Sequence, residues 1–147
     1  MRTDVPTYRR LIELQIATAI IDTALAEGYH VEIWNGGDEA WVEHTRDRAE
    51  ILDGLLEADD DTIHFCDERG TSAGYVHLVS GNGYHVICQT SGDVLAERLT
   101  APAVDLAETI EDWVIANASS DQEFRKLMVS RHPYGTRFDD HWVLKAA

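Results

Sequence analysis

The residues best suited to chemistry lie between positions 64 and 88, where both cysteines of the chain and three of its seven histidines occur. Sulfur and imidazole nitrogen are ligands that zinc prefers, and four of them bind the ion tetrahedrally. Successive side chains of a strand point to opposite faces of a sheet, so the expected strands place four such residues on one face. These candidate metal ligands are His64, Cys66, His77 and Cys88.

The spacing of these residues disfavours a zinc site. His64 and Cys66 would lie about 6.6 Å apart along a strand, whereas zinc-bound atoms converge to within about 4 Å of one another. No C-x2-C pair supplies the tight turn of a zinc knuckle. A cysteine in an apolar strand commonly behaves as a small buried side chain. We therefore predict no cofactor and keep a zinc protein as an alternative.

A thiol enzyme would use the same face, with Cys88 as the nucleophile and His77 as its base. Cross-strand pairs in the middle of a sheet usually serve packing, and no donor for an oxyanion is evident beside this pair. The chain also lacks the phosphate-loop, G-x-S-x-G and H-E-x-x-H motifs. The sequence thus favours a protein that is not an enzyme, with catalysis on the His/Cys face as an alternative.

Aromatic residues are the candidates for binding another molecule. Trp34 ends an alternating segment on its polar face, beside a turn at residues 35–38. Tyr75, His77 and Tyr84 share a sheet face with the cysteines in the expected register. Large aromatic side chains often anchor interfaces between proteins. We predict Trp34, Tyr75, His77 and Tyr84 as the binding residues.

The net charge of the chain limits the classes of molecule that it can bind. There are 27 acidic residues against 12 basic ones, which gives a formal net charge of −15. Nucleic acids and anionic membranes are bound through Lys and Arg, so direct binding to either is excluded. No apolar run approaches the roughly 20 residues of a membrane span, and no signal peptide is apparent. We expect a cytoplasmic protein.

The acidity has two interpretations, a solvated surface suited to high salt or a surface that meets a basic partner. A sharper version of the second is an inhibitor that imitates nucleic acid and occupies the basic groove of a host enzyme. That function requires acidic side chains gathered on one face. The acids to examine are Glu57, Asp59, Asp60, Asp61, Asp139 and Asp140.

Hydrophobic periodicity and turn residues predict the elements. A long helix with a wide apolar face is expected over 7–26, and a further helix begins at Thr45. Another helix opens at Pro102. The remaining expected elements are strands at 29–34, 40–44, 62–67, 73–80 and 84–90, and short helices at 92–99 and 121–128.

This order of elements predicts a single α+β domain over residues 1–147. The sheet is antiparallel with about five strands, in the order helix-β-β-helix-β-β-β-helices, and the helices pack on one face. Residues 130–147 form an apolar tail that we expect to dock on the domain or on a neighbour. The wide apolar face of the first helix favours a homodimer.

Residues 74–91, GYVHLVSGNGYHVICQTS, resemble a hairpin in small uncharacterised proteins of phages and plasmids. Tyr75 and Tyr84 stand where those proteins have tryptophan, and His85 replaces an aspartate. The resemblance extends over the preceding strand and turn. It implies an accessory protein of a mobile element and no known activity. The function predicted is therefore an acidic protein-interaction module, with the inhibitor and the His/Cys enzyme as alternatives.

Overall fold

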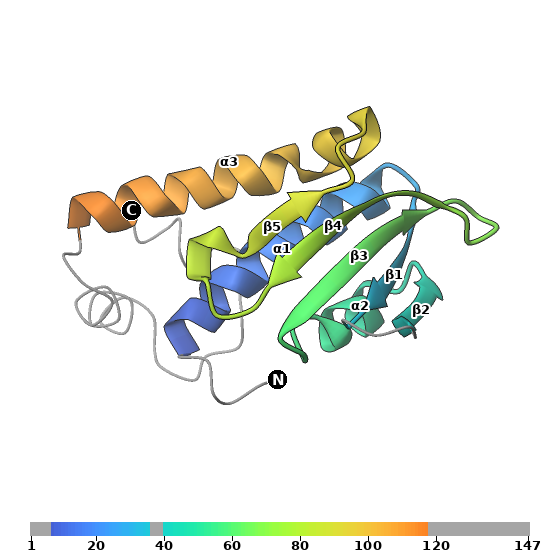
Figure 1. Ribbon diagram of the computed structural model, residues 1–147, viewed down its shortest axis with the longest axis horizontal. Helices are drawn as coiled ribbons and strands as arrows, with labels where there is room; N and C mark the ends of the chain where they lie inside the picture. Colours follow the sequence, from blue (N-terminus) through green and yellow to red (C-terminus); the bar gives the residue numbers. More distant parts are fainter. Residues whose placement is uncertain (1–6, 36–39, 118–147) are drawn as a thin grey trace.

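The computed structural model describes residues 7–35 and 40–117. Its elements are α1 (Thr7–Ala26), β1 (His30–Trp34), β2 (Ala40–Thr45), α2 (Arg48–Gly54), β3 (Asp60–Cys66), β4 (Ser72–Val79), the 3-10 turn η1 (Gly83–His85), β5 (Ile87–Thr90) and α3 (Val94–Asn117). The strands form one antiparallel, five-stranded sheet in the order β2-β1-β3-β4-β5 (Figure 1). The predicted α+β fold is confirmed.

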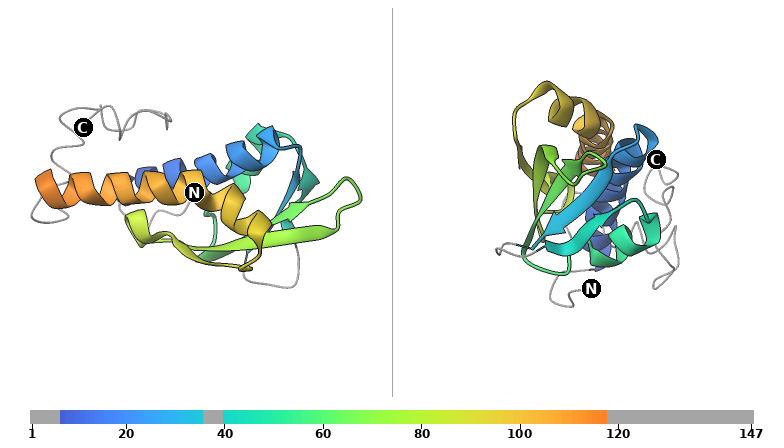
Figure 2. Two further views of the ribbon diagram at one scale, coloured as in Figure 1. Left: turned by 90° about the horizontal axis from the view of Figure 1, so that it is seen from above. Right: turned by 90° about the vertical axis from the view of Figure 1, so that its right-hand side faces the viewer.

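The helices form a layer on one face of the sheet. Helices α1 and α3 pack against each other there (Figure 2), and the short helix α2 contacts β1, β2 and α1. Alternate strand residues point into this layer and are fully buried, which stabilises the fold by roughly 1.5–3 kcal/mol for each side chain. They include Val31, Ile33, Ile63, Phe65, Val76 and Leu78. Among the described helices, none combines the length and apolarity that crossing a bilayer requires.

Helix α1 is buried continuously over residues 12–18. Its isoleucines at 12, 16 and 20 belong to the core that it shares with the sheet and with α3. The wide apolar face predicted for this helix is therefore covered within the chain itself. A second subunit is not needed to bury it, and the predicted homodimer stays a prediction.

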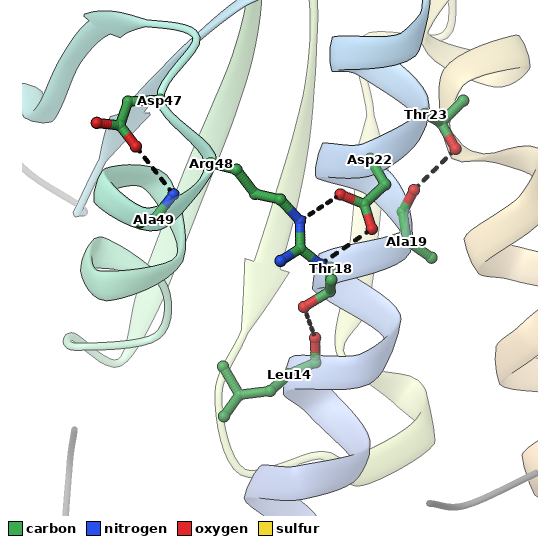
Figure 3. A network of polar contacts seen from close by, with 8 residues as sticks. All are labelled: Leu14, Thr18, Ala19, Asp22, Thr23, Asp47, Arg48 and Ala49. Carbon is green, nitrogen blue, oxygen red and sulfur yellow. Dashed lines mark hydrogen bonds and ion pairs between the residues drawn. The ribbon is translucent and has the colours of Figure 1, made fainter. Parts of the chain in front are cut away.

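Polar contacts tie α2 to α1 (Figure 3). The carboxylate of Asp47 caps α2 by accepting from the N–H of Ala49 at 3.1 Å. Arg48 donates to both carboxylate oxygens of Asp22, at 2.7 and 3.2 Å. The helix was expected to begin at Thr45. That residue instead ends β2, and its hydroxyl accepts from the N–H of Asp47 at 3.0 Å.

A buried carboxylate on α1 shapes the connection between β4 and β5. Glu13 is fully buried, and its Oε2 accepts from the N–H groups of both Gly81 and Gly83 at 2.9 Å. The chain therefore turns through η1, and the strand predicted over 84–90 begins only at Ile87. Val86, which follows η1, is fully buried in the core.

Helix α3 is one element where two helices were predicted. It begins after Asp93, whose Oδ1 accepts from the N–H of Ala96 at 2.7 Å, and it runs through Pro102. Proline removes one backbone donor, and Figure 2 shows the first turns of α3 set at an angle to the rest. The helix predicted at 121–128 and the tail at 130–147 lie outside the described residues, as do Asp139 and Asp140.

Candidate binding surface on the open face of the sheet

The described helices leave one face of the sheet uncovered, and Figure 1 looks onto it. We call it the outer face. Residues paired across antiparallel strands share a face, so the register assigns its members. One row joins Glu32, His64 and Tyr75 across β1, β3 and β4, and the next joins Trp34, Thr62, His77 and Gln89 from β1 to β5.

Three aromatic rings from three strands lie side by side on the outer face. The rings of Trp34 and His64 meet edge to face, with centroids 6.0 Å apart and an interplanar angle of 65°. His64 and Tyr75 are 5.8 Å apart and tilted by 49°. Trp34 Nε1 donates to the Glu32 carboxylate at 2.5 Å, which fixes both side chains. We call these four residues, Glu32, Trp34, His64 and Tyr75, the aromatic corner.

The electrostatics of the aromatic corner depend on His64. Burial lowers the pKa of this imidazole, and the nearby Glu32 carboxylate opposes that shift. The ring is therefore neutral at pH 7. Its Nδ1 shares a hydrogen bond of 3.0 Å with Ser72 Oγ, which holds the ring in place. Glu32 is then the charged member of the corner.

Further imidazoles lie around the aromatic corner. Nδ1 of His77 is 3.1 Å from the hydroxyl of Thr62. The rings of His30 and His44 stack with centroids 4.2 Å apart, and Nε2 of His44 donates to the carbonyl of Asp67 at 2.9 Å. These contacts give the outer face a row of ordered rings and hydroxyl groups, which is a surface suited to binding.

The four candidate metal ligands take separate environments. A bulge in β5 pairs His77 with Gln89, so Cys88 falls in the irregular position and is exposed. Cys66 is buried at the end of β3, and His64 is bonded to Ser72. Within residues 7–35 and 40–117, no three His, Cys, Asp or Glu side chains are grouped so that they could hold a metal ion.

The two thiols also differ in reactivity. Burial raises the pKa of Cys66 to about 11, with Glu32 and Asp67 adding to the effect. The thiolate is the nucleophilic form, so Cys66 is unreactive at neutral pH. Cys88 is exposed, but its supposed base His77 is engaged by Thr62. The geometry gives little support to a thiol enzyme.

The predicted binding residues separate into two groups. Trp34, Tyr75 and His77 lie on the outer face. Tyr84 does not, because it belongs to η1, where its ring packs against the core and lies 4.7 Å from the ring of His85. Sequence reasoning missed Glu32. Strand alternation placed it beside Trp34, but a charged residue at such a position is ordinarily a solvated one.

Both edges of the sheet are irregular. The pairing of β2 with β1 shifts register twice, and Trp41 lies in one of these irregular positions with 55% of its surface exposed. At the other edge, β5 has four residues and a bulge. Bulged, short edge strands resist the addition of a further strand. Neither edge is therefore a good template for pairing with a further strand.

The chain matches no protein-family model, and neither a curated protein nor a solved structure is significantly similar to it. The resemblance of residues 74–91 to phage and plasmid proteins stays a prediction.

Proposed function

We propose that this protein is an interaction module whose outer face binds a positively charged partner protein. The observation that carries the proposal is the aromatic corner, in which Trp34, His64 and Tyr75 lie together on a sheet face that the described helices leave uncovered. Tryptophan and tyrosine contribute most of the binding energy at many protein interfaces. Rings ordered before binding lose little conformational entropy when a partner arrives.

Charge supports a basic partner over a second copy of the chain. The net charge of −15 attracts a cationic protein over a distance and repels an identical one. The rows of the outer face contain no lysine or arginine in the described chain, and they carry Glu32, with Asp60 at the start of β3. Complementary charge raises the rate of association and selects the partner.

A selection of peptides on the immobilised full-length protein tests this function. We expect enrichment of peptides rich in Arg or Lys, and their capture should fall strongly with Trp34→Leu. Trp41→Leu is the matched control, because it removes an exposed tryptophan from the edge strand β2. Circular dichroism verifies that both variants fold. Enriched peptides that bind the Trp34→Leu variant as well as the wild type would refute a role for the outer face.

A second candidate is the inhibitor that imitates nucleic acid, and helix α3 favours it. Asp105, Glu108 and Asp112 are exposed on the helix, and their spacing puts them on one side over about 10 Å. The acid run at 57–61 contributes less than predicted, because Asp61 is fully buried. Three of the six acids named for this function are thus buried or outside the described chain, so the outer face carries the stronger case.

A competition assay with two sets of variants distinguishes the two candidate functions. A nucleic-acid mimic competes with duplex DNA for a basic DNA-binding protein, and it loses this ability when Asp105, Glu108 and Asp112 are changed together to Asn, Gln and Asn. The Trp34→Leu variant should then compete normally. The opposite pattern, with loss only in Trp34→Leu, supports the outer face.

A further inference from the structure

We infer that the aromatic corner is a seat for one guanidinium group, supplied by an arginine side chain of the partner. The inference rests on the proposed function and deepens it. Glu32, Trp34, His64 and Tyr75 come from β1, β3 and β4, so the seat lies across the middle of the sheet.

The three rings form one aromatic patch that contains rings from three adjacent strands. Trp34 and Tyr75 flank His64 on opposite sides, with centroids at 6.0 and 5.8 Å from it, and neither ring lies parallel to the imidazole. A group bound over His64 would therefore have an aromatic ring from a neighbouring strand on either side. A cation within about 6 Å of an aromatic centroid is attracted by the ring, and tryptophan is the best partner.

A carboxylate completes the seat. Glu32 accepts from Trp34 Nε1 through Oε1, and an ionised carboxylate has further lone pairs for other donors. The bond to the indole orients the carboxylate beside the ring before any ligand arrives. The neutral ring of His64 does not repel a cation, since burial keeps the pKa of this imidazole low.

The chemistry favours arginine over lysine. A guanidinium is planar, stacks on aromatic faces and donates to a carboxylate at the same time. It is also less strongly hydrated than an ammonium, so it loses less hydration free energy on entering a half-buried site. An anion is disfavoured, because Glu32 would repel it and the corner has no cationic side chain among the described residues.

The test uses capped pentapeptides that differ at one position. Arginine is compared with citrulline, which has nearly the same shape without the charge, and with lysine. The full-length protein is titrated, and NMR follows the indole N–H of Trp34 and the ring of Tyr75. We expect saturable shifts at both residues with arginine, at least about fivefold weaker binding with lysine, and no saturable shift with citrulline.

Two substitutions sharpen the result. Glu32→Gln keeps an acceptor for Trp34 Nε1 and removes the charge, and it should weaken binding of the arginine peptide by about 5- to 30-fold. Glu43→Gln is the matched control, because Glu43 is an exposed acid on β2 outside the corner. An equal loss in both variants would show that only overall charge matters, and it would overturn the seat.

Failure of the seat and failure of the proposed function are distinguishable. If arginine and citrulline peptides shift Trp34 and Tyr75 equally, the outer face binds peptides but has no guanidinium seat. Equal shifts with lysine and arginine would overturn the preference for a guanidinium. If the arginine peptide shifts only residues of α3, such as Asp105 and Asp112, both the seat and the binding role of the outer face are refuted.

Discussion

The carboxylate of Asp61 accepts a hydrogen bond of 2.6 Å from the backbone N–H of Leu56. The guanidinium of Arg10, on α1, donates to the carbonyl of the same leucine at 2.5 Å. All three residues are buried, and Leu56 has a φ of 58°, in the left-handed region that non-glycine residues rarely occupy. Both backbone groups of one strained residue are thus held by buried charges, which fixes the connection from α2 to β3.

Asp61 should make the stability of the protein depend on pH. Burial raises the pKa of this carboxyl from 3.8 to about 6. The hydrogen bond from the N–H of Leu56 and the charge of Arg10 oppose this rise, whereas Asp60 and Glu57 add to it. The folded state therefore binds the proton more tightly than the unfolded chain. The stabilisation by protonated Asp61 is present below pH 4 and is lost as pH rises to about 6 and beyond.

The Asp61→Asn variant measures this contribution. Asparagine keeps an oxygen for the N–H of Leu56 and does not titrate. The free energy of unfolding of the wild type relative to the variant should fall by up to about 3 kcal/mol between pH 4 and pH 7.5. Urea unfolding at several pH values gives the difference. A constant difference across this range would contradict the raised pKa.

Substitutions of Leu56 test whether its backbone is strained in the connection from α2 to β3. Leu56→Ala should cost about 2–5 kcal/mol, because it removes a fully buried side chain. Leu56→Gly removes even more, yet glycine accepts a positive φ without strain. We expect the glycine variant to be about 1 kcal/mol more stable than the alanine variant, the reverse of the order in ordinary backbone. Denaturant unfolding gives the free energy of unfolding of both variants. An alanine variant more stable than the glycine variant would exclude the strained conformation of Leu56.

Glu13 should control the turn that follows β4. Glu13→Ala leaves the N–H groups of Gly81 and Gly83 without their acceptor, and it should destabilise the protein by about 2–4 kcal/mol. Glu13→Gln retains one oxygen and should cost less. Hydrogen exchange at the two glycine amides is the local measurement. Unchanged exchange at both amides in Glu13→Ala would contradict this role.

The turn between β4 and β5 was not predictable from the local sequence, although the faces of the strands were. Strand alternation correctly placed Val76, Leu78 and Ile87 on the buried face of the sheet and Tyr75 and His77 on the other face. This prediction needs only the sequence of each strand, because successive side chains point to opposite faces. Alternation could not predict η1, since the shape of that turn depends on Glu13, which lies far away in the sequence.

The same limit applies elsewhere in the fold. The acidic run at residues 57–61 carries no sign of burial in the sequence, yet Asp61 is fully buried and accepts from the N–H of Leu56. Pro102 predicted a helix start, although packing of α3 along α1 continues the helix through it. Most of the aromatic corner was predictable from alternation on β1, β3 and β4. The contact of Glu32 with Trp34 was not, because it depends on the conformations of the two side chains.

The cysteines should differ sharply toward an alkylating reagent. Cys88 is exposed, whereas Cys66 is buried and burial raises its pKa to about 11. At pH 8 the folded protein should therefore react at Cys88 alone, and Cys66 should react only after denaturation. Mass spectrometry of peptides identifies the labelled residue. Rapid labelling of Cys66 in the folded state would contradict its buried, protonated environment.

The most direct test of the binding role of the outer face is the affinity of one selected basic peptide for two tryptophan variants. Calorimetry on full-length protein should give a dissociation constant at least about 10-fold weaker for Trp34→Leu than for the wild type. The Trp41→Leu variant, changed at the exposed edge of β2, should stay within about twofold of the wild type. Equal affinities for wild type and Trp34→Leu, or a larger loss in Trp41→Leu, would contradict the account.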